Sequence, residues 1–397
     1  MHCSLVSACL VTTICTGIAV AQSPVAYVYV AEDAHDTTGS LNSPISVYAA
    51  SPGGKLTQIK GSPFTKPLGT IIGTNGTHFV TVDQNQTTHQ YLRVYDVSSD
   101  GAIGEEVSKQ DLHEWCGADQ GGVLDHTGQY VYVVESQSCG GGYVSFALSK
   151  KGELTFKGSF TDGSEPFFSP PVFSGNDKFA YTAISNFDYP CPTDTFLGLG
   201  RESSGALESI SFSETDPTTP SGGYQVTQNT VPTADSTNHL AASVTFLDGD
   251  CGQSGPQYNG LASYTIQSNG DLVSTNTWEN VAPLAAYLAP GGIKANPAGN
   301  ILAAAAGTGI QFFHFNGADP ITPFAGNEII GTSGYIQDIA WDSDNHLYAL
   351  NYKSGRLHVY NVTTKGVVEA PGSPYLPLNS CSGGGCYPQT LIVRSVP

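Results

Sequence analysis

The sequence predicts an all-β fold, a seven-bladed β-propeller built from four-stranded antiparallel blades. Three observations lead to this prediction. A hairpin signature recurs along the whole chain, the strand that precedes each hairpin is apolar on both faces, and the two ends of the chain supply complementary strands of one blade. No segment has the length and periodicity of a convincing helix.

The hairpin signature is an aromatic or aliphatic residue, a glycine six positions later, and an aliphatic residue two beyond that. Its six copies are Tyr48-Gly54-Leu56, Tyr95-Gly101-Ile103, Phe146-Gly152-Leu154, Leu199-Gly205-Leu207, Tyr264-Gly270-Leu272 and Tyr360-Gly366-Val368. A seventh copy, Phe313-Asp319-Ile321, has Asp in place of the glycine. Successive copies lie 47 to 65 residues apart, which is typical of stacked units that cannot bury their apolar faces alone. Each copy predicts a tight hairpin in which glycine takes a positive φ.

A second type of strand lies upstream of each hairpin and is rich in β-branched and aromatic residues. These strands are expected at 27–31, 78–82, 130–134, 179–184, 240–244, 301–305 and 347–350. Apolar residues at successive positions indicate a strand that is covered on both faces. Most of these strands follow a polar turn that is itself preceded by a short apolar strand, and a fourth strand follows each hairpin. Each repeat therefore predicts one four-stranded blade.

The two ends of the chain predict how the ring closes. The segment 27–31 reads as a second strand with no first strand before it, whereas Gln389–Val393 reads as a first strand with nothing after it. We therefore expect the C-terminal strand to complete the N-terminal blade from the inside. Such closure removes the exposed strand edges of an open array.

Residues 1–21 are expected to be a signal peptide, because the apolar segment Leu5–Ala21 ends in the small-residue pattern Ala19-Val20-Ala21. A lipoprotein site at Cys9 is an alternative, but little apolar sequence precedes that cysteine. Residues 22–397 then form a single propeller domain. No later segment is apolar over about 20 residues, so no membrane insertion is expected. The predicted location is secreted, periplasmic or otherwise extracellular.

The cysteines that follow residue 21 favour disulfides over metal ligation, because their number is even and no CxxC pair is present. All six fall in segments expected at one face of the propeller. The candidate pairs are Cys381–Cys386, Cys191–Cys251 and Cys116–Cys139, although the sequence leaves all 15 possible pairings open.

The charge of the chain limits its partners. The formal net charge is −19 with only 15 Lys and Arg, so neither nucleic acid nor an anionic membrane surface is expected as a partner. Walker and dinucleotide-binding glycine motifs are absent from the sequence, and the acidic runs 32–36 and 248–250 lack the spacing of an EF-hand loop. No cofactor and no metal are therefore expected.

The first repeat carries a family resemblance. Its segments Tyr27–Glu32 (YVYVAE), Ile45–Tyr48 (ISVY), the Gly54 hairpin and Gly61–Phe64 (GSPF) resemble the YVTN-type, 6-phosphogluconolactonase-like propellers. The resemblance extends over residues 24–397. It implies a seven-bladed propeller and, for catalytic members, a lactone hydrolase with His, Arg or Glu at the axial mouth.

Alignment of the seven first strands predicts an uncharged ring near that mouth. The aligned positions are Gly69, Gln120, Ser169, Thr230, Gly291, Gln337 and Gln389. Amides and hydroxyls suit a neutral polyol, and they can equally satisfy backbone groups around a wet channel. Ligand contacts are predicted for the three glutamines, with Asp119 and Asp338 as the nearest carboxylates.

Two functions remain open at this point. The segments that enter the first strands carry neither His nor Arg, which favours an interaction module that binds a small polar ligand, a glycan or a protein. The family resemblance favours an enzyme, a carboxylic-ester hydrolase acting on an unphosphorylated sugar lactone. An aldonolactone hydrolysis assay distinguishes the two.

Overall fold

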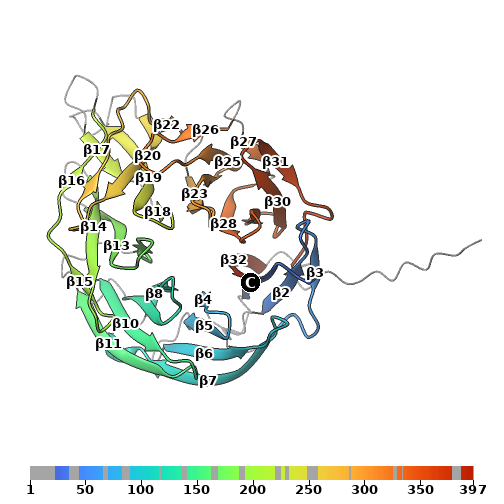
Figure 1. Cartoon of the computed structure of the whole chain (residues 1–397). Coiled ribbons are helices and arrows are strands. Elements are labelled where there is room, and N and C mark those ends of the chain that lie inside the picture. Colours follow the sequence, from blue (N-terminus) through green and yellow to red (C-terminus); the bar gives the residue numbers. More distant parts are fainter. Residues whose placement is uncertain are drawn as a thin grey trace, which may run out of the picture.

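The structure is a computed structural model of the whole chain. It describes residues 23–34, 44–65, 70–82, 90–115, 118–135, 141–161, 169–186, 193–219, 225–228, 232–247, 258–285, 288–324, 329–332, 334–377 and 386–396. These residues form seven sheets arranged as blades around a central axis (Figure 1). The seven-bladed propeller predicted from the repeats is therefore confirmed.

The first three blades follow the predicted strand order. Blade one contains β32 (Cys386–Ser395), β1 (Ala26–Ala34), β2 (Ile45–Ala50) and β3 (Leu56–Gln58), from the axis outward. Blade two contains β4 (Thr70–Thr74), β5 (His78–Val82), β6 (Tyr91–Val97) and β7 (Ile103–Asp111). After the short helix η1 (His113–Trp115), blade three contains β8 (Ala118–Leu124), β9 (Tyr130–Glu135), β10 (Gly142–Leu148) and β11 (Leu154–Thr161).

The last four blades complete the ring. Blade four contains β12 (Val172–Phe173), β13 (Phe179–Asn186), β14 (Thr193–Arg201) and β15 (Leu207–Ser209). Blade five contains β17 (Gln225–Gln228), β18 (Thr233–Ala234), β19 (His239–Leu247), β20 (Tyr258–Ile266), β21 (Leu272–Val273), β22 (Ala282–Pro283) and β16 (Glu214–Thr215). Blade six contains β23 (Leu288–Ala295), β24 (Ile301–Ala306), β25 (Gly309–His314), β26 (Thr322–Pro323) and β27 (Ile329–Gly331). Blade seven contains β28 (Ile336–Trp341), β29 (His346–Asn351), β30 (Leu357–Thr363) and β31 (Gly366–Glu369).

Ring closure occurs as the two ends predicted. The C-terminal strand β32 pairs antiparallel with β1, with Ala26 opposite Ser395 and Ala31 opposite Thr390. It occupies the innermost position of blade one (Figure 1). The N-terminal blade is thus completed by residues more than 350 positions away in sequence.

The apolar core is divided among the seven interfaces between neighbouring blades. Alternate residues of β1 show how this arises: Val28 and Val30 pack on blade seven, whereas Tyr27 and Tyr29 pack on blade two. Every one of these four side chains is at least 94% buried. The second strands are apolar at successive positions because both of their faces are covered by protein.

The hairpin glycines have two structural roles. Gly101 and Gly205 have φ angles of 84° and 95°, which side chains with a Cβ seldom adopt. Each also lies against an aromatic ring of the preceding blade. A Cβ on Gly101 would lie 2.3 Å from the Tyr27 ring, and one on Gly205 would lie 1.9 Å from the Tyr130 ring. The repeated glycine therefore sets both the turn within a blade and the contact between blades.

The seventh copy of the signature reaches the same contact with a different turn. Gly317, two positions before Asp319, has a φ of 64° and packs against the ring of His239 in blade five. Asp319 donates its backbone N–H to Asn316 at 3.3 Å and needs no positive φ. The role that the alignment gave to position 319 is filled by Gly317.

The widest spacing between hairpin glycines, from Gly205 to Gly270, contains a segment that joins two blades. After β15, the chain leaves blade four, and β16 pairs in parallel with β21 on blade five. Glu214 and Asp216 approach one another in this segment, and burial followed by the charge of Asp216 raises the pKa of Glu214 to about 9. The insertion thus adds an edge strand without adding a blade.

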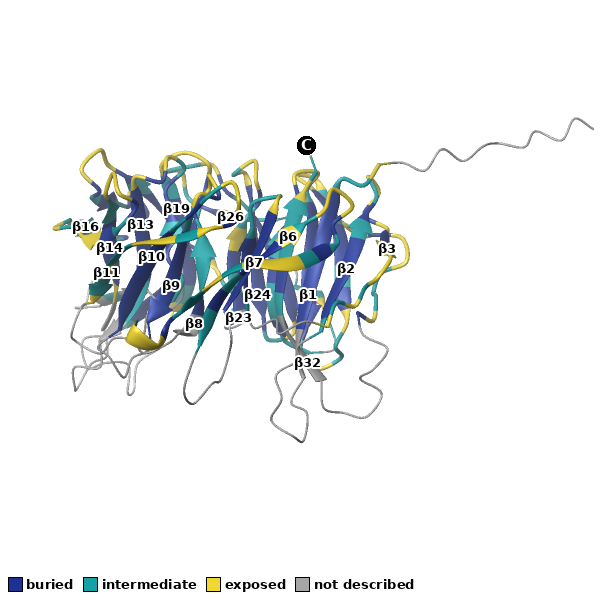
Figure 2. Ribbon diagram, turned by 90° about the horizontal axis from the view of Figure 1, so that it is seen from below, coloured by how far each residue is buried: buried dark blue, intermediate teal, exposed yellow. Residues whose placement is uncertain are grey.

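The propeller has two distinct faces (Figure 2). We call one the turn face, because it carries the turns from first to second strands, such as 125–128, and hairpins such as 149–152. We call the other the loop face, where second strands end at residues such as Glu135 and Asn351. Within the described residues, no helix has the length and apolar character needed to cross a membrane.

Candidate functional site

A cavity of about 1290 Å³ runs along the axis of the propeller and is lined by residues of all seven blades. Most of its wall is small or aliphatic, as on β4, where Ile71 to Thr74 contribute, and on β32, where Thr390 to Val393 contribute. The ionisable side chains among its lining residues are Asp125, His126, Asp235, Lys294 and Asp338. They divide the cavity into two polar regions, one toward each face.

Toward the loop face, four of the inner strands carry a β-bulge at one level. The register shifts between Ala118 and Gly122 in β8, between Leu288 and Ile293 in β23, and between Ile336 and Asp338 in β28. In β32 it shifts around position 389, opposite the step from Ala31 to Glu32. In blade three this shift lies opposite the end of the second strand β9, at Val134 and Glu135. The other three shifts lie opposite the equivalent positions of β24, β29 and β1. A bulge leaves residues outside the ladder and redirects their side chains.

The residues aligned from the sequence coincide with these bulges. Gln120, Gly291, Gln337 and Gln389 all fall within them, as does Asp119. The side chains of Asp119, Gln120 and Gln389 lie outside the described residues, as do Gly69 and Thr230. Gln337 is half-buried, and the cavity wall beside it is formed by its neighbour Asp338. The described part of the channel therefore contains charged groups next to the predicted uncharged ring.

Asp338 connects the last blade to the closing strand. Its Oδ2 atom accepts the backbone N–H of Leu391 in β32 at 2.8 Å, and its Oδ1 atom accepts the backbone N–H of Ile339 at 2.8 Å. Burial raises the pKa of Asp338 to about 6, although the Lys294 ammonium and the two N–H groups act in the opposite direction. A carboxylate in this range can take up or release a proton near neutral pH.

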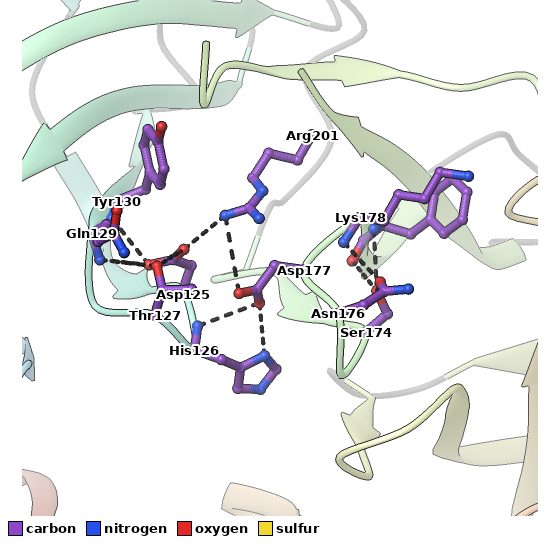
Figure 3. A network of polar contacts seen from close by, with 11 residues as sticks. Asp125, His126, Thr127, Gln129, Tyr130, Ser174, Asn176, Asp177, Lys178 and Arg201 are labelled. Atoms are coloured by element: carbon purple, nitrogen blue, oxygen red, sulfur yellow. Dashed lines mark hydrogen bonds and ion pairs between the residues drawn. The ribbon is translucent and has the colours of Figure 1, made fainter. Parts of the chain in front are cut away.

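Toward the turn face, the cavity is bordered by a network that sequence reasoning did not identify (Figure 3). His126 Nδ1 lies 2.7 Å from Asp177 Oδ1, so the imidazole of blade three meets a carboxylate of blade four. Arg201 donates to Asp125 Oδ2 at 2.7 Å and lies 4.0 Å from Asp177 Oδ2. The hydrogen bond to Asp177 raises the pKa of His126. Burial alone would raise the pKa of Asp177, but the hydrogen bonds from His126 and the charges of His126 and Arg201 together outweigh it, and the pKa falls below its usual value.

The sequence signal for this network is a polar turn, which alone does not distinguish a functional histidine from a structural one. Residues 125 and 126 belong to a polar turn of the kind that begins several blades. Similar turns hold His–Asp pairs with a structural role, as at His346, which is 97% buried and bonded to Asp342 at 2.7 Å. His126 differs because its side chain is 54% exposed and lines the cavity. Only the three-dimensional arrangement separates the two cases.

The disulfide candidates lie outside the part of the chain that can be assessed. Cys116, Cys139, Cys191, Cys251 and Cys381 are not among the described residues, and Cys386 begins β32 without a described side chain. Their pairing therefore stays a prediction. Among the described residues, no group of three or more His, Cys, Asp or Glu side chains is arranged to hold a metal ion.

Comparisons with known proteins identify similar folds. No protein-family model matches the chain, and no curated protein matches it. Among solved structures, a Bacteroides fragilis protein provisionally assigned as a 6-phosphogluconolactonase superposes with a TM-score of 0.59 and 12% identity, covering 93% of this chain and 98% of its own. A protein from Bacteroides uniformis with the same provisional assignment gives a TM-score of 0.55 and 15% identity, covering 93% and 99%.

A third structure, of a protein from Lactobacillus plantarum, gives a TM-score of 0.52 and 11% identity, covering 87% of this chain and 94% of its own. These identities are too low to carry residue roles from one protein to another. The superpositions agree with the propeller fold described above. The chain has the seven-bladed propeller fold of the lactonase-like proteins.

Proposed function

We propose that this protein is an exported binding module that takes a small, neutral, hydroxyl-rich ligand, such as a polyol or a sugar, at the loop-face end of its channel. The observation that carries the proposal is the level shared by the bulges of β8, β23, β28 and β32. Three of these bulges contain a glutamine, namely Gln120, Gln337 and Gln389, and the fourth contains two adjacent glycines. In the bulge of β28, Gln337 stands next to the lining residue Asp338 and is not itself part of the cavity wall. Amides on separate blades around one axis can donate to and accept from several hydroxyls at once.

A triple variant of the glutamines tests this site. Each neutral hydrogen bond contributes about 0.5–1.5 kcal/mol net, so Gln120→Ala, Gln337→Ala and Gln389→Ala together should weaken binding by about tenfold to a thousandfold. Binding is measured by a glycan array followed by calorimetry on the best ligand. Gln129→Ala, an exposed amide on the turn face, is the matched control. A triple variant that keeps its melting temperature and its full affinity rules out this site.

Lactone hydrolysis is the second candidate function, and Asp338 is the observation that favours it. Its pKa of about 6 suits a general base near neutrality. The carboxylate would take a proton from water as the water attacks the lactone carbonyl, and the ring C–O bond would break as the protonated Asp338 returns this proton to the leaving ring oxygen, which gives the hydroxy acid. The Lys294 ammonium, which acts on Asp338 through its charge, is the nearest cation of the channel wall for the developing oxyanion.

The two candidate functions give different results in one experiment. Hydrolysis of glucono-1,5-lactone above the spontaneous rate, with a rate that rises through pH 6 and is lost in Asp338→Asn, would identify an enzyme. An absence of hydrolysis together with polyol binding that depends on the three glutamines would identify a binding module. The assay should use the chain from residue 22 onward, without the expected signal peptide.

A further inference from the structure

The turn-face end of the cavity has a chemistry different from that of the loop-face end. Its lining includes His126 from the turn after β8, together with Ser236, Asn296 and Asp235 from the turns of blades five and six. His126 is the most exposed of the His and Asp side chains that form ion pairs in these turns, at 54%. In Figure 3 the His126 ring lies on the side of Asp177 away from Arg201.

Asp177, which holds this imidazole, occupies a strained backbone position. Its backbone N–H donates to the carbonyl oxygen of Ser174, three residues earlier. Three residues of other blades make the same hydrogen bond in the equivalent turn, namely Gly128, Gly299 and Asn345. All four have positive φ angles, from 55° at Asp177 to 68° at Gly299. Glycine tolerates this conformation best, and Asn and Asp tolerate it better than other residues. A non-glycine residue there costs some backbone energy, and Asp177 supplies in return a carboxylate between His126 and Arg201.

The carboxylate also determines which nitrogen of His126 is available. Because an ionised carboxylate only accepts, Nδ1 of His126 carries the hydrogen of the 2.7 Å contact. The backbone N–H of His126 also donates to the same oxygen at 3.3 Å. The ring is therefore fixed in orientation, and Nε2 is the atom left for a ligand: an acceptor when neutral and a charged donor when protonated.

The cavity wall carries charged side chains of both signs. Asp125 is fully buried and bonded to Arg201, and Asp235 is 8% exposed and bonded to His239. Asp338 is half-buried, is bonded to two backbone N–H groups and faces the charge of Lys294. His126 and Lys294 both present exposed side chains. Toward the turn face, His126 is thus the most exposed ionisable group of the described lining.

We propose that the turn-face end of the channel is a binding site for a small organic carboxylate, with His126 as the charged hydrogen-bond donor and Lys294 as a second cation deeper in the channel. A singly charged anion is favoured over a phosphate dianion because phosphate sites use bidentate arginine or clustered donors, and Arg201 is already engaged by Asp125 and Asp177. The site shares Lys294 with the hydrolysis candidate, but His126 lies away from the loop-face bulges, and the site does not depend on the neutral-ligand proposal.

The charge state of His126 makes binding at this site pH-dependent. The charged groups that face its ring are Asp177 from blade four, Asp125 from its own turn and Arg201 from β14. The two carboxylates favour the imidazolium and Arg201 opposes it, with a net increase in the pKa of His126. Carboxylate affinity should therefore be highest at mildly acidic pH and should fall as the pH rises through the imidazole titration.

Calorimetry of the full chain with gluconate, phosphate and the neutral polyol sorbitol tests this proposal at pH 6 and pH 8.5. We expect gluconate to bind more tightly at the lower pH, and His126→Gln to weaken it by about tenfold to a hundredfold at pH 6, the contribution of a charge-assisted hydrogen bond. The same variant should lose the pH dependence. Lys294→Met should weaken gluconate at both pH values.

His239→Gln is the matched control, because His239 forms the same kind of pair with Asp235 at 2.8 Å on the same face but is not a lining residue of the cavity. Melting temperatures of all variants identify any that fail to fold. Asp177→Asn supplies a second test, because it removes the carboxylate that holds His126. Asn345 shows that asparagine fits this turn. The proposal is overturned if gluconate does not bind at about 10 mM, if phosphate binds as tightly, if His126→Gln weakens sorbitol as much as gluconate, or if His126→Gln and His239→Gln have equal effects.

Discussion

Substitution of Gly205 by alanine should strongly destabilise the fold, because this glycine serves both the hairpin and the contact between blades three and four. Its φ of 95° costs an L-residue about 1–2 kcal/mol. The new Cβ would also lie 1.9 Å from Cε1 and 2.2 Å from Cδ1 of Tyr130. Forcing apart a packed contact costs about 1–3 kcal/mol. We therefore expect Gly205→Ala to lower the free energy of unfolding by about 2–5 kcal/mol.

The control variant is Gly355→Ala, which separates the two costs. Gly355 also has a positive φ, of 63°, but a Cβ there would meet nothing within 4 Å. This variant should lose only the backbone contribution of about 1–2 kcal/mol. Urea unfolding followed by tryptophan fluorescence measures both, with the slope m checked so that the free energies can be compared.

A double-mutant cycle tests the contact itself. If the Tyr130 ring is the obstacle, Tyr130→Ala should make room for the new methyl, and the double variant should be more stable than the sum of the two single effects predicts. The coupling should be about 1–3 kcal/mol in favour of the double variant. A Gly205→Ala variant no less stable than Gly355→Ala, or a cycle with zero coupling, would show that the ring does not constrain this turn.

Three further predictions concern the closure of the ring, the channel residue Asp338 and a disulfide. Deletion of Gln389–Pro397 should leave blade one without its inner strand and lower both solubility and melting temperature; a truncated chain that melts like the full one would contradict the closure. The native pKa of Asp338, about 6, lies above its ordinary value of 3.8, so its contribution to stability is greatest below pH 4 and is lost as the pH rises toward 6. Asp338→Asn should abolish this pH dependence. The free energy of unfolding of the wild type, relative to that of the variant, should therefore fall by about 1–3 kcal/mol between pH 4.5 and pH 7.5. Non-reducing peptide mapping should find a Cys381–Cys386 disulfide, and quantitative alkylation of the unreduced protein would exclude it.

Most of the fold could be predicted because each repeat contains its own evidence. The glycine six residues after Tyr95 or Phe146 marks a hairpin, and its positive φ is a local requirement of the chain. The apolar residues of β1 indicate coverage on both faces before any neighbour is known. Closure follows from a count of strands at each end, since an unpaired edge must be covered.

The binding chemistry depends on contacts between blades, which no local pattern specifies. Alignment of first strands brought Gln337 to the level of a bulge, but the cavity wall there is formed by Asp338, because the bulge shifts the register by one residue. A bulge is a property of paired strands, and a single strand does not reveal it.

The His126 network shows the same limit more clearly. The sequence determined that residues 125 to 128 form a polar turn, and many turns of this kind are only structural. Asp177 lies 51 positions further along the chain and in another blade. The curvature of the ring, set by packing at seven interfaces, brings its carboxylate to the imidazole. Tertiary structure alone therefore decided that this histidine faces the channel with one nitrogen held and the other available.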